Sequence, residues 1–420
     1  MRKREILSLV VVSLVVFFAV SAFIFAEEKV TLEWYCWGRA TELDFFRLAA
    51  KTYSEQHPNV EVNLTETGWV DHFRVLDVRI AGNSAPDIFR CNFGHVTRYL
   101  NAGACADLTP YVDEDWWRTF WFTLRSFVEK DDKIYGIPQM CDTAVTYYNK
   151  DYLEAVGARI LDSAKDYWTW SEWEDIGRKV KEQTKADYGF AGWAANTSGY
   201  PTYINTYGGS FMTASGELPN IDTPAVREAL EQQKRWYDEG LEPISSLRSI
   251  SENPFDLFTL GKIGMTIQSP NFDWVQENVQ DKFNWGVTYC PGSIFGNTGH
   301  LGGSINIVSN QCKHQKEAYE FIRWLMEDER LSDYCQLNYI PAIENVAKTM
   351  TYEHWDEATK IVIEQYGQIP NILVQEMKHP NHTGNMQIYA DVTSQYYVGK
   401  ISLDECIDML TKGIGDLLKQ

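Results

Sequence analysis

The sequence predicts an α/β protein with more than one domain, in which parallel-dominated sheets are flanked by helices. Between residues 30 and 91 the pattern runs strand, helix, strand, helix, strand, which is the order typical of a parallel sheet covered by helices. The chain has 420 residues, 44% of them hydrophobic. It is therefore too long for one typical domain and can bury two or three cores.

The first elements follow from local signals. Val30–Trp37 is a β-rich apolar run that stops at Gly38, so we expect a strand there. Residues Thr41–His57 have the apolar spacing of a helix, and Thr41 with Asp44 can form a capping box at its start. The next elements are expected as a strand at Asn59–Thr67, a helix at Trp69–Gly82 and a strand at Pro86–Cys91.

Helices in the later part of the chain show capping residues or an amphipathic pattern. Tyr167–Thr184 begins with Thr169 or Ser171 as its cap, and Asp222–Glu239 has Thr223 as its cap. Amphipathic helices are also expected at Lys316–Asp328 and Leu403–Lys419.

The N-terminus has the pattern of an export signal. Three positive charges in Met1–Arg4 precede an apolar run from Ile6 to Phe25, which closes on the small residue Ala26. We expect residues 1–26 to be removed after export, although the run is long enough to stay as an uncleaved anchor. No cysteine follows the run directly, so the sequence carries no lipid-anchor signal.

The net charge excludes some partners. At −20, the chain repels phosphates, which argues against nucleic acid and anionic membranes as partners. The charge disfavours an anionic solute more weakly, because a local site can oppose the overall sign.

Eight cysteines are scattered along the chain without a CxxC motif, which excludes zinc-ribbon and thioredoxin-type sites. Disulfides are compatible with export, but a chain of this length does not need them, so we favour buried free thiols. Cys36, Cys91 and Cys141 each end a predicted strand, and we expect them to lie near one another.

Three segments, in order along the chain, carry a family resemblance. Asp132–Lys150 reads DKIYGIPQMCDTAVTYYNK, with one short strand ending near Asp142 and a second starting at Ala144. The others are Pro86–Tyr111 and Gly302–Leu325. Together they resemble extracellular (periplasmic) solute-binding proteins of family 1, the carbohydrate-binding component of ABC importers, similar to maltose- and oligosaccharide-binding proteins.

The resemblance implies a two-lobe α/β fold with a ligand cleft between the lobes, each lobe a parallel-dominated sheet flanked by helices. The first lobe would comprise residues 27–142 and 300–340, and the second residues 143–299 and 341–420. The chain would cross between lobes near Asp142–Tyr147, Gly296–Gly302 and Asn338–Ala342. Ligands bind outside the carboxyl ends of strands in such sheets, and here those ends would face each other.

Candidate ligand-binding residues lie at strand ends and in glycine-containing loops. The chain has 15 Trp, 23 Tyr and 20 Phe, and an aromatic cleft with a few polar groups fits a sugar, which presents an apolar face and a rim of hydroxyls. The candidates are Trp37, Gly38, Trp69, Asp71, Asn92, Phe93, Asp142, Trp193, Tyr207, Asn271, Trp274, Gly302, Gly303, His382 and Gln387.

Several candidates have a structural alternative. Trp37 fits the core as well as the site, Asp71 fits a helix N-cap, and Trp274 can pack a helix against its lobe. The pair Gly302–Gly303 fits a tight strand entry equally well. A carboxylate at Asp142 can accept two sugar hydroxyls, which we favour over a hinge-capping role.

The motifs GxSxG, HExxH, GxGxxG and GxxxxGK[ST] are absent. His379 and His382 have HxxH spacing, but Pro380 between them argues against a metal site, and we expect no cofactor. The sequence thus favours a periplasmic or secreted, monomeric sugar-binding protein that delivers its ligand to importer membrane subunits. The alternatives are an exported carbohydrate-active enzyme, or a binding protein for a non-sugar solute such as a polyamine or glycerol phosphodiester.

Overall fold

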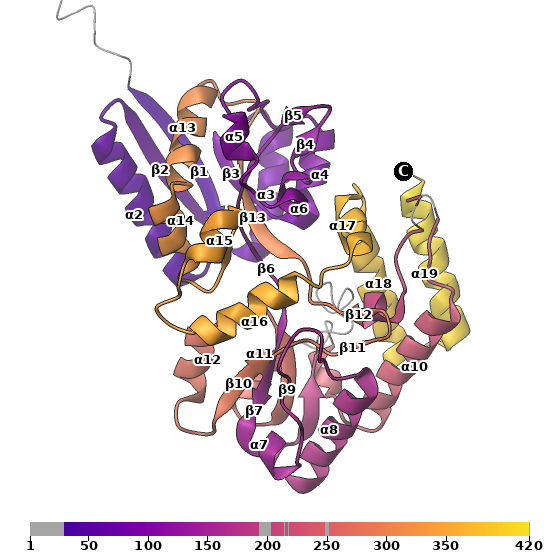
Figure 1. Ribbon diagram of the computed structural model, residues 1–420. Coiled ribbons are helices and arrows are strands. Elements are labelled where there is room, and N and C mark those ends of the chain that lie inside the picture. The colour runs from indigo at the N-terminus through magenta and orange to yellow at the C-terminus, as the bar shows by residue number, and fades with distance from the viewer. Residues whose placement is uncertain (1–28, 193–202, 214, 217, 248–251, 420) are drawn as a thin grey trace, which may run out of the picture.

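The computed structural model describes residues 29–192, 203–213, 215–216, 218–247 and 252–419. It has two lobes, each with its own sheet, and β6 leads from the upper lobe to the lower one in Figure 1. The predicted export signal and Trp193 lie outside the described residues. Within them, no helix combines the length and apolar character needed to cross a membrane.

The first lobe is built on a six-stranded sheet in the order β14-β6-β13-β3-β1-β2. Its strands are β1 (Val30–Trp37), β2 (Val60–Thr67), β3 (Ile88–Cys91), β6 (Ile137–Asp142), β13 (Gly302–Val308) and β14 (Ile340–Pro341). Its main helices are α2 (Ala40–Gln56), α3 (Trp69–Ala81), α4 (Phe93–Asn101), α13 (Gln315–Leu325), α14 (Asp328–Cys335) and α15 (Glu344–Thr349). Short elements complete it: α5 (Glu114–Trp117), α6 (Phe122–Arg125), β4 (Glu129–Lys130) and β5 (Lys133–Ile134).

The second lobe is built on a four-stranded sheet in the order β10-β7-β9-β8. The strands are β7 (Val145–Asn149), β8 (Tyr188–Ala191), β9 (Ile263–Gln268) and β10 (Trp285–Thr288), with a hairpin of β11 (Gly292–Ser293) and β12 (Gly296–Asn297). The helices are α7 (Lys150–Ala155), α8 (Trp170–Gln183), α10 (Pro224–Asp238), α11 (Pro254–Thr259), α12 (Phe272–Val279), α16 (Asp356–Tyr366), α17 (Asn371–Lys378), α18 (His382–Tyr397) and α19 (Leu403–Leu418). Two 3₁₀ turns lie at Asn205–Tyr207 and Ile244–Ser246.

The sheets are mixed, so the expectation of parallel-dominated sheets is wrong. Among the strands that the structure describes, parallel pairing joins β1 with β2, β1 with β3, and β8 with β9. The strands next to the lobe crossings pair antiparallel. The reason is direction: β6 ends at the cleft with Asp142, whereas β13 starts there with Gly302, opposite Asp142.

The chain changes sheets between β6 and β7, and again between β12 and β13. Helix α16 contacts β6 of the first sheet and β7 and β10 of the second. Ile343 pairs with Phe120, so α15 lies with the first sheet. The lobe boundaries expected from the sequence remain a proposal.

Helix starts agree with the sequence in two places and differ in one. Thr169 accepts from the backbone of Glu172 at the start of α8, and Thr223 accepts from Val226 at the start of α10. The capping box expected of Thr41 and Asp44 is wrong, because α2 begins one residue before Thr41. Its N-cap is Arg39, whose backbone N–H donates to the Glu42 carboxylate at 3.0 Å.

All eight cysteines are buried and unbridged. Cys36 and Cys91 lie on neighbouring strands, but Tyr35 pairs with Phe89, so these two thiols are one position out of register and point to opposite faces. Strand β13 separates Cys91 from Cys141, which places them about two strand spacings apart, too far for a disulfide. The expected cluster of three thiols is therefore absent.

We expect almost none of the cysteines to react with a thiol reagent in the folded protein. After unfolding without reductant, all eight should react. Burial raises the pKa of these thiols, to about 12 for Cys105 and Cys406, and a buried protonated thiol is a poor nucleophile. Thiol titration before and after denaturation measures both numbers. Six or fewer thiols in the unfolded, unreduced protein would contradict the structure.

Candidate functional site

Two adjoining cavities of about 510 and 330 Å³ lie between the lobes. They share a wall of Trp37, Glu42, Trp69, Asp142, Ser269 and Tyr339. Their volumes fall in the range of small-molecule sites. The other lining residues come from strand ends of the first lobe and from three parts of the second lobe: Phe255 in α11, the segment after β9, and the region around the start of α18.

Strand ends deliver the first-lobe residues to this place. Trp37 is the last residue of β1, Asn92 follows β3, and Asp142 ends β6. These three strands run toward the cleft, and β13 starts there with Gly302. From the second lobe, Ser269 follows β9 at the facing edge.

Two tryptophans form an aromatic wall. The Trp37 ring lies 5.2 Å from Trp69 and 5.4 Å from Phe73, centroid to centroid. Behind it, the Arg90 guanidinium lies 4.7 Å from the Trp37 ring centre, a cation–π contact that fixes the ring. Trp69 is 51% exposed, an unusual state for a tryptophan. Trp37 thus serves both roles weighed from the sequence, packing against the core and lining the cavity.

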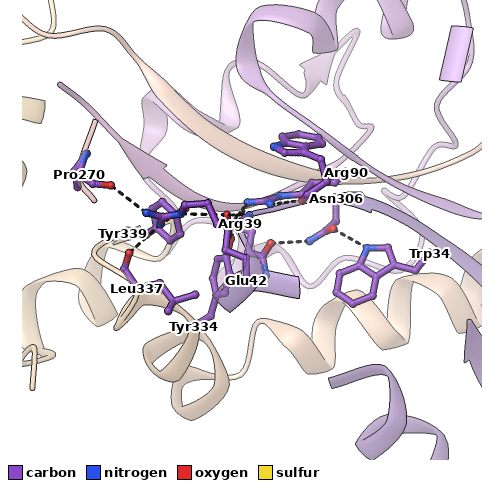
Figure 2. Close-up of polar contacts among 11 residues, drawn as sticks. Trp34, Arg39, Glu42, Arg90, Pro270, Asn306, Tyr334, Leu337 and Tyr339 are labelled. Carbon is purple, nitrogen blue, oxygen red and sulfur yellow. Dashed lines mark hydrogen bonds and ion pairs between the residues drawn. The ribbon is translucent and has the colours of Figure 1, made fainter. Parts of the chain in front are cut away.

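A buried ion pair lies below this wall, and Figure 2 shows it. Arg90 donates to the Glu42 carboxylate at 2.8 Å, to the Trp37 carbonyl at 2.7 Å and to the Tyr334 hydroxyl at 2.7 Å. Tyr334 in turn donates to Glu42 at 2.8 Å. Burial alone would raise the pKa of Glu42, but the guanidinium groups of Arg90 and Arg39 outweigh it and lower that pKa to about 2.

Asp142 faces the larger cavity with its carboxylate unengaged. The side chain is 9% exposed and forms no hydrogen bond with any residue that the structure describes. Burial raises its pKa, and nearby His300 opposes the rise only in part. A buried carboxylate is costly unless it accepts hydrogen bonds, and a ligand with hydroxyl groups can donate them.

The two glycines that open β13 are required by close approach. A Cβ on Gly302 would lie 1.9 Å from the Asp142 Oδ1 atom. Gly303 has φ of 141° and would place a Cβ 2.4 Å from the Met140 carbonyl oxygen. The tight strand entry considered from the sequence is therefore present, and both glycines also line the cavity.

His95 is a polar group that the sequence did not single out. Its Nδ1 lies 2.7 Å from the Asn92 Oδ1, and its ring stacks on Phe73 at 3.8 Å with an interplanar angle of 4°. Burial is the main cause that lowers the pKa of His95 to about 3, and the nearby positive charge of Arg98 lowers it further in the same direction. Burial likewise lowers the pKa of His382 to about 4. Both rings are neutral above these values.

The structure places many of the predicted residues on the cavity walls. These are Trp37, Gly38, Trp69, Asn92, Phe93, Asp142, Asn271, Gly302, Gly303 and His382. Whether they bind the ligand remains a proposal.

Four other candidates lie outside the cavity walls. Asp71 is exposed and pairs with Arg74 at 2.7 Å, and it is not the cap of α3, which is Gly68. Tyr207 donates to Gln232 within the second lobe. Trp274 packs on Phe255 with centroids 5.6 Å apart. Gln387 is exposed on α18 and donates to Asp391 at 2.7 Å.

Further lining residues were not singled out from the sequence. They include Arg39, Glu42, Arg90, His95, Ser269, Pro270, His300, Tyr339, Met377, Thr383 and Met386. Ser269 comes directly after β9 and Arg39 lies two residues after the end of β1, a signal that could have found them. Glu42 could not be found in this way, because its partners Arg90 and Tyr334 lie 48 and 292 positions away. Within the described residues, no group of three or more His, Cys, Asp or Glu is arranged to hold a metal.

A family comparison matches most of the chain: the family described as bacterial extracellular solute-binding protein matches residues 39–330. The lactose-binding protein of Rhizobium radiobacter is 25% identical over 303 residues, which are 69% of this chain and 68% of the relative. The maltodextrin-binding protein MdxE of Bacillus subtilis is 23% identical over 380 residues, which are 87% of this chain and 86% of the relative.

Solved structures share the fold. The GacH receptor of Streptomyces glaucescens, solved unliganded and with acarbose, superposes with a TM-score of 0.81 at 19% identity, covering 94% of this chain and 100% of the other. An ABC substrate-binding protein of Listeria monocytogenes in complex with cycloalternan gives a TM-score of 0.78 at 21% identity, covering 93% and 100%. These likenesses confirm the predicted two-lobe α/β fold.

Removing the charge of Glu42 should strongly destabilise the fold. In Glu42→Gln the buried Arg90 guanidinium loses its counter-charge, and breaking a buried pair in this way costs about 3–5 kcal/mol. The matched control is Asp44→Asn, on the same helix, which removes an exposed pair with Arg47 and should cost less than about 1 kcal/mol. Urea unfolding measures both changes in the free energy of unfolding, and equal small losses would show that the pair is unimportant.

Proposed function

Because the chain belongs to the family of bacterial extracellular solute-binding proteins, we propose that it captures a sugar or oligosaccharide outside the cytoplasm and delivers it to an ABC importer. The family comparison confirms the resemblance seen in the sequence. Relatives are named for lactose and maltodextrin, and structural neighbours were solved with acarbose and cycloalternan. One observation in this chain carries the proposal: an interlobe cavity that sets two indole rings beside an unengaged buried carboxylate.

That combination fits the two faces of a sugar. The apolar C–H face can lie on Trp69 and Trp37, and flat rings supply this contact with little loss of side-chain entropy. The Asp142 carboxylate can accept hydrogen bonds from ligand hydroxyls. The two tryptophans and Asp142 all belong to the first lobe, so this lobe would hold the ligand first.

The charges of the cavity support a neutral solute over the alternatives. The guanidinium groups of Arg39 and Arg90 already donate to protein oxygens, which disfavours a phosphodiester. Arg90 and Tyr334 already engage Glu42, so Asp142 is the one lining carboxylate among the described residues without a partner. A polyamine carries several positive charges and needs more than one free carboxylate.

The same charges bear on the enzyme alternative. A glycosidase needs two carboxyl groups that both act on the substrate, and the Glu42 carboxylate is already engaged by Arg90, Tyr334 and the Arg39 backbone N–H. The family and the named relatives are binding proteins. We therefore propose that the solute leaves unchanged.

Capture would follow hinge closure. Ligand held by the first lobe gains contacts with Ser269 and Asn271 of the second lobe, which stabilises the closed state. The importer membrane subunits would recognise that state. We further propose a monomer that residues 1–26 direct to the periplasm or the outside of the cell, and that binds no nucleic acid and no cofactor.

A thermal-shift screen against a carbohydrate panel, followed by calorimetry, tests the proposal. Trp69→Ala and Trp37→Ala should each weaken binding by about 2 kcal/mol, roughly thirtyfold, as expected for a stacking ring at the centre of a site. The matched control is Phe122→Ala, which removes a ring that is 72% exposed and lies outside both cavities. A panel without any binder, or two tryptophan variants that bind like the parent, would refute the assignment.

Sugar affinity should be constant at neutral pH and fall in acid. Burial raises the pKa of Asp142 above that of an ordinary aspartate, so the carboxylate gains a proton earlier as the pH drops and accepts fewer hydroxyl bonds. The ligand hydroxyls bind the ionised Asp142 carboxylate. Affinity is therefore fully present above the pKa that Asp142 has in the ligand-free protein, and it is lost as the pH falls below that pKa.

Calorimetry across a pH series checks this dependence. Asp142→Asn should bind more weakly at neutral pH and lose the acid step. Asp71→Asn, an exposed change on the same lobe, should keep the parent profile. An unchanged acid step in Asp142→Asn would assign the titration to another group.

A further inference from the structure

Arg39 spans the two lobes at the edge of the smaller cavity. It lies between β1 and α2 in the first lobe. One of its terminal nitrogens, Nη1, donates to the Asn271 Oδ1 at 2.8 Å and to the Pro270 carbonyl at 3.3 Å. Both acceptors follow β9 in the second lobe. Figure 2 shows Arg39 reaching Pro270 on one side, with Glu42 on the other.

The first lobe holds this guanidinium in place. Nη2 donates to the Tyr339 hydroxyl and to the Leu337 carbonyl at 3.2 Å. The Nε atom lies 3.6 Å from the Glu42 carboxylate, which also accepts the Arg39 backbone N–H at 3.0 Å. A side chain fixed at so many points loses little further freedom when it bonds across the cleft.

The second-lobe acceptors are also held. The Tyr147 hydroxyl donates to the Ser269 carbonyl at 3.2 Å and accepts from the Asn271 backbone N–H at 2.9 Å. Tyr147 is buried in β7, at the start of the second lobe. The segment 269–271 therefore moves with its sheet, and a bond to it is a bond between lobes.

We propose that Arg39 is a positioning residue that clasps the second lobe to the first before any ligand is bound. The clasp sets segment 269–271 as a wall of the site, so a population of ligand-free protein is already closed. This inference rests on the proposed function, because it concerns closure of the same cleft. The clasp differs from the ligand contacts because its hydrogen bonds join one lobe of the protein to the other. These bonds are charge-assisted, and such bonds are stronger than hydrogen bonds between neutral groups.

Small-angle scattering of the ligand-free protein tests the clasp. The parent should have a smaller radius of gyration than Arg39→Gln, because more of the parent is closed. We expect about a tenfold shift in the closed-to-open ratio, equivalent to about 1.4 kcal/mol. Arg39→Lys should also open the protein, because a single ammonium cannot replace a planar fork with several donors.

The matched control is Arg47→Gln, on the same helix, whose partners Asp44 and Glu66 are exposed residues of the same lobe. Asn271→Ala approaches the clasp from the other side and leaves the first-lobe network intact. It should open the ligand-free protein, and the double variant should be no more open than Arg39→Gln alone, because Arg39→Gln already removes the bond to Asn271.

The outcomes separate the clasp from other roles. A ligand-free parent that is already as open as Arg39→Gln overturns the inference. If Arg39 only contacted ligand, its variants would bind the best sugar of the panel more weakly without any change in ligand-free scattering, which also overturns it. Failure of the whole proposed function would appear elsewhere, as a carbohydrate panel without any binder. Melting curves verify folding, and Asn271→Ala keeps the test open if Arg39 variants do not fold.

Discussion

The buried pair of Arg90 and Glu42 is the interaction on which the cleft depends. Two charges removed from water are costly unless their donors and acceptors find partners. Here Tyr334, the Trp37 carbonyl and the Arg39 backbone supply several of these partners, and among the described residues only the Arg90 Nε of this pair is left without one. The pair in turn orients two functional groups. Arg90 lies behind the Trp37 ring and fixes one wall of the cavity, and Glu42 fixes the start of α2 and with it Arg39.

The direction of the strands explains why polar and aromatic groups meet between the lobes. Strands β1, β3 and β6 run toward the cleft and end in Trp37, Cys91 and Asp142, while β9 of the second lobe ends facing them. Backbone groups at strand ends are free of ladder partners, and side chains there leave the core. The fold therefore concentrates variable chemistry in one place while the sheets stay apolar.

Sequence reasoning could follow strands to their ends but could not see across the fold. Trp37, Asn92 and Asp142 were predicted because each follows an apolar strand, and the structure places them on the cavity walls. Asp71 and Gln387 were predicted for the site but lie outside the cavity walls. A position after a strand or in a polar loop does not determine which side of a helix faces the cleft. The sheets were expected to be parallel-dominated, and the antiparallel pairing of β13 was not foreseen, because its direction depends on where the chain re-enters the lobe. Glu42 reads as an ordinary surface residue of α2 until Arg90 and Tyr334 are brought to it.

The burial of every cysteine has a practical consequence for engineering. An added surface cysteine would be the single reactive thiol of the folded protein, since all eight native ones are covered. A fluorescent dye could then be attached at one chosen point on the rim of the cleft without replacing any native residue. Rotation of the lobes would change the surroundings of that dye, which would convert the protein into a reagentless optical sensor for its solute.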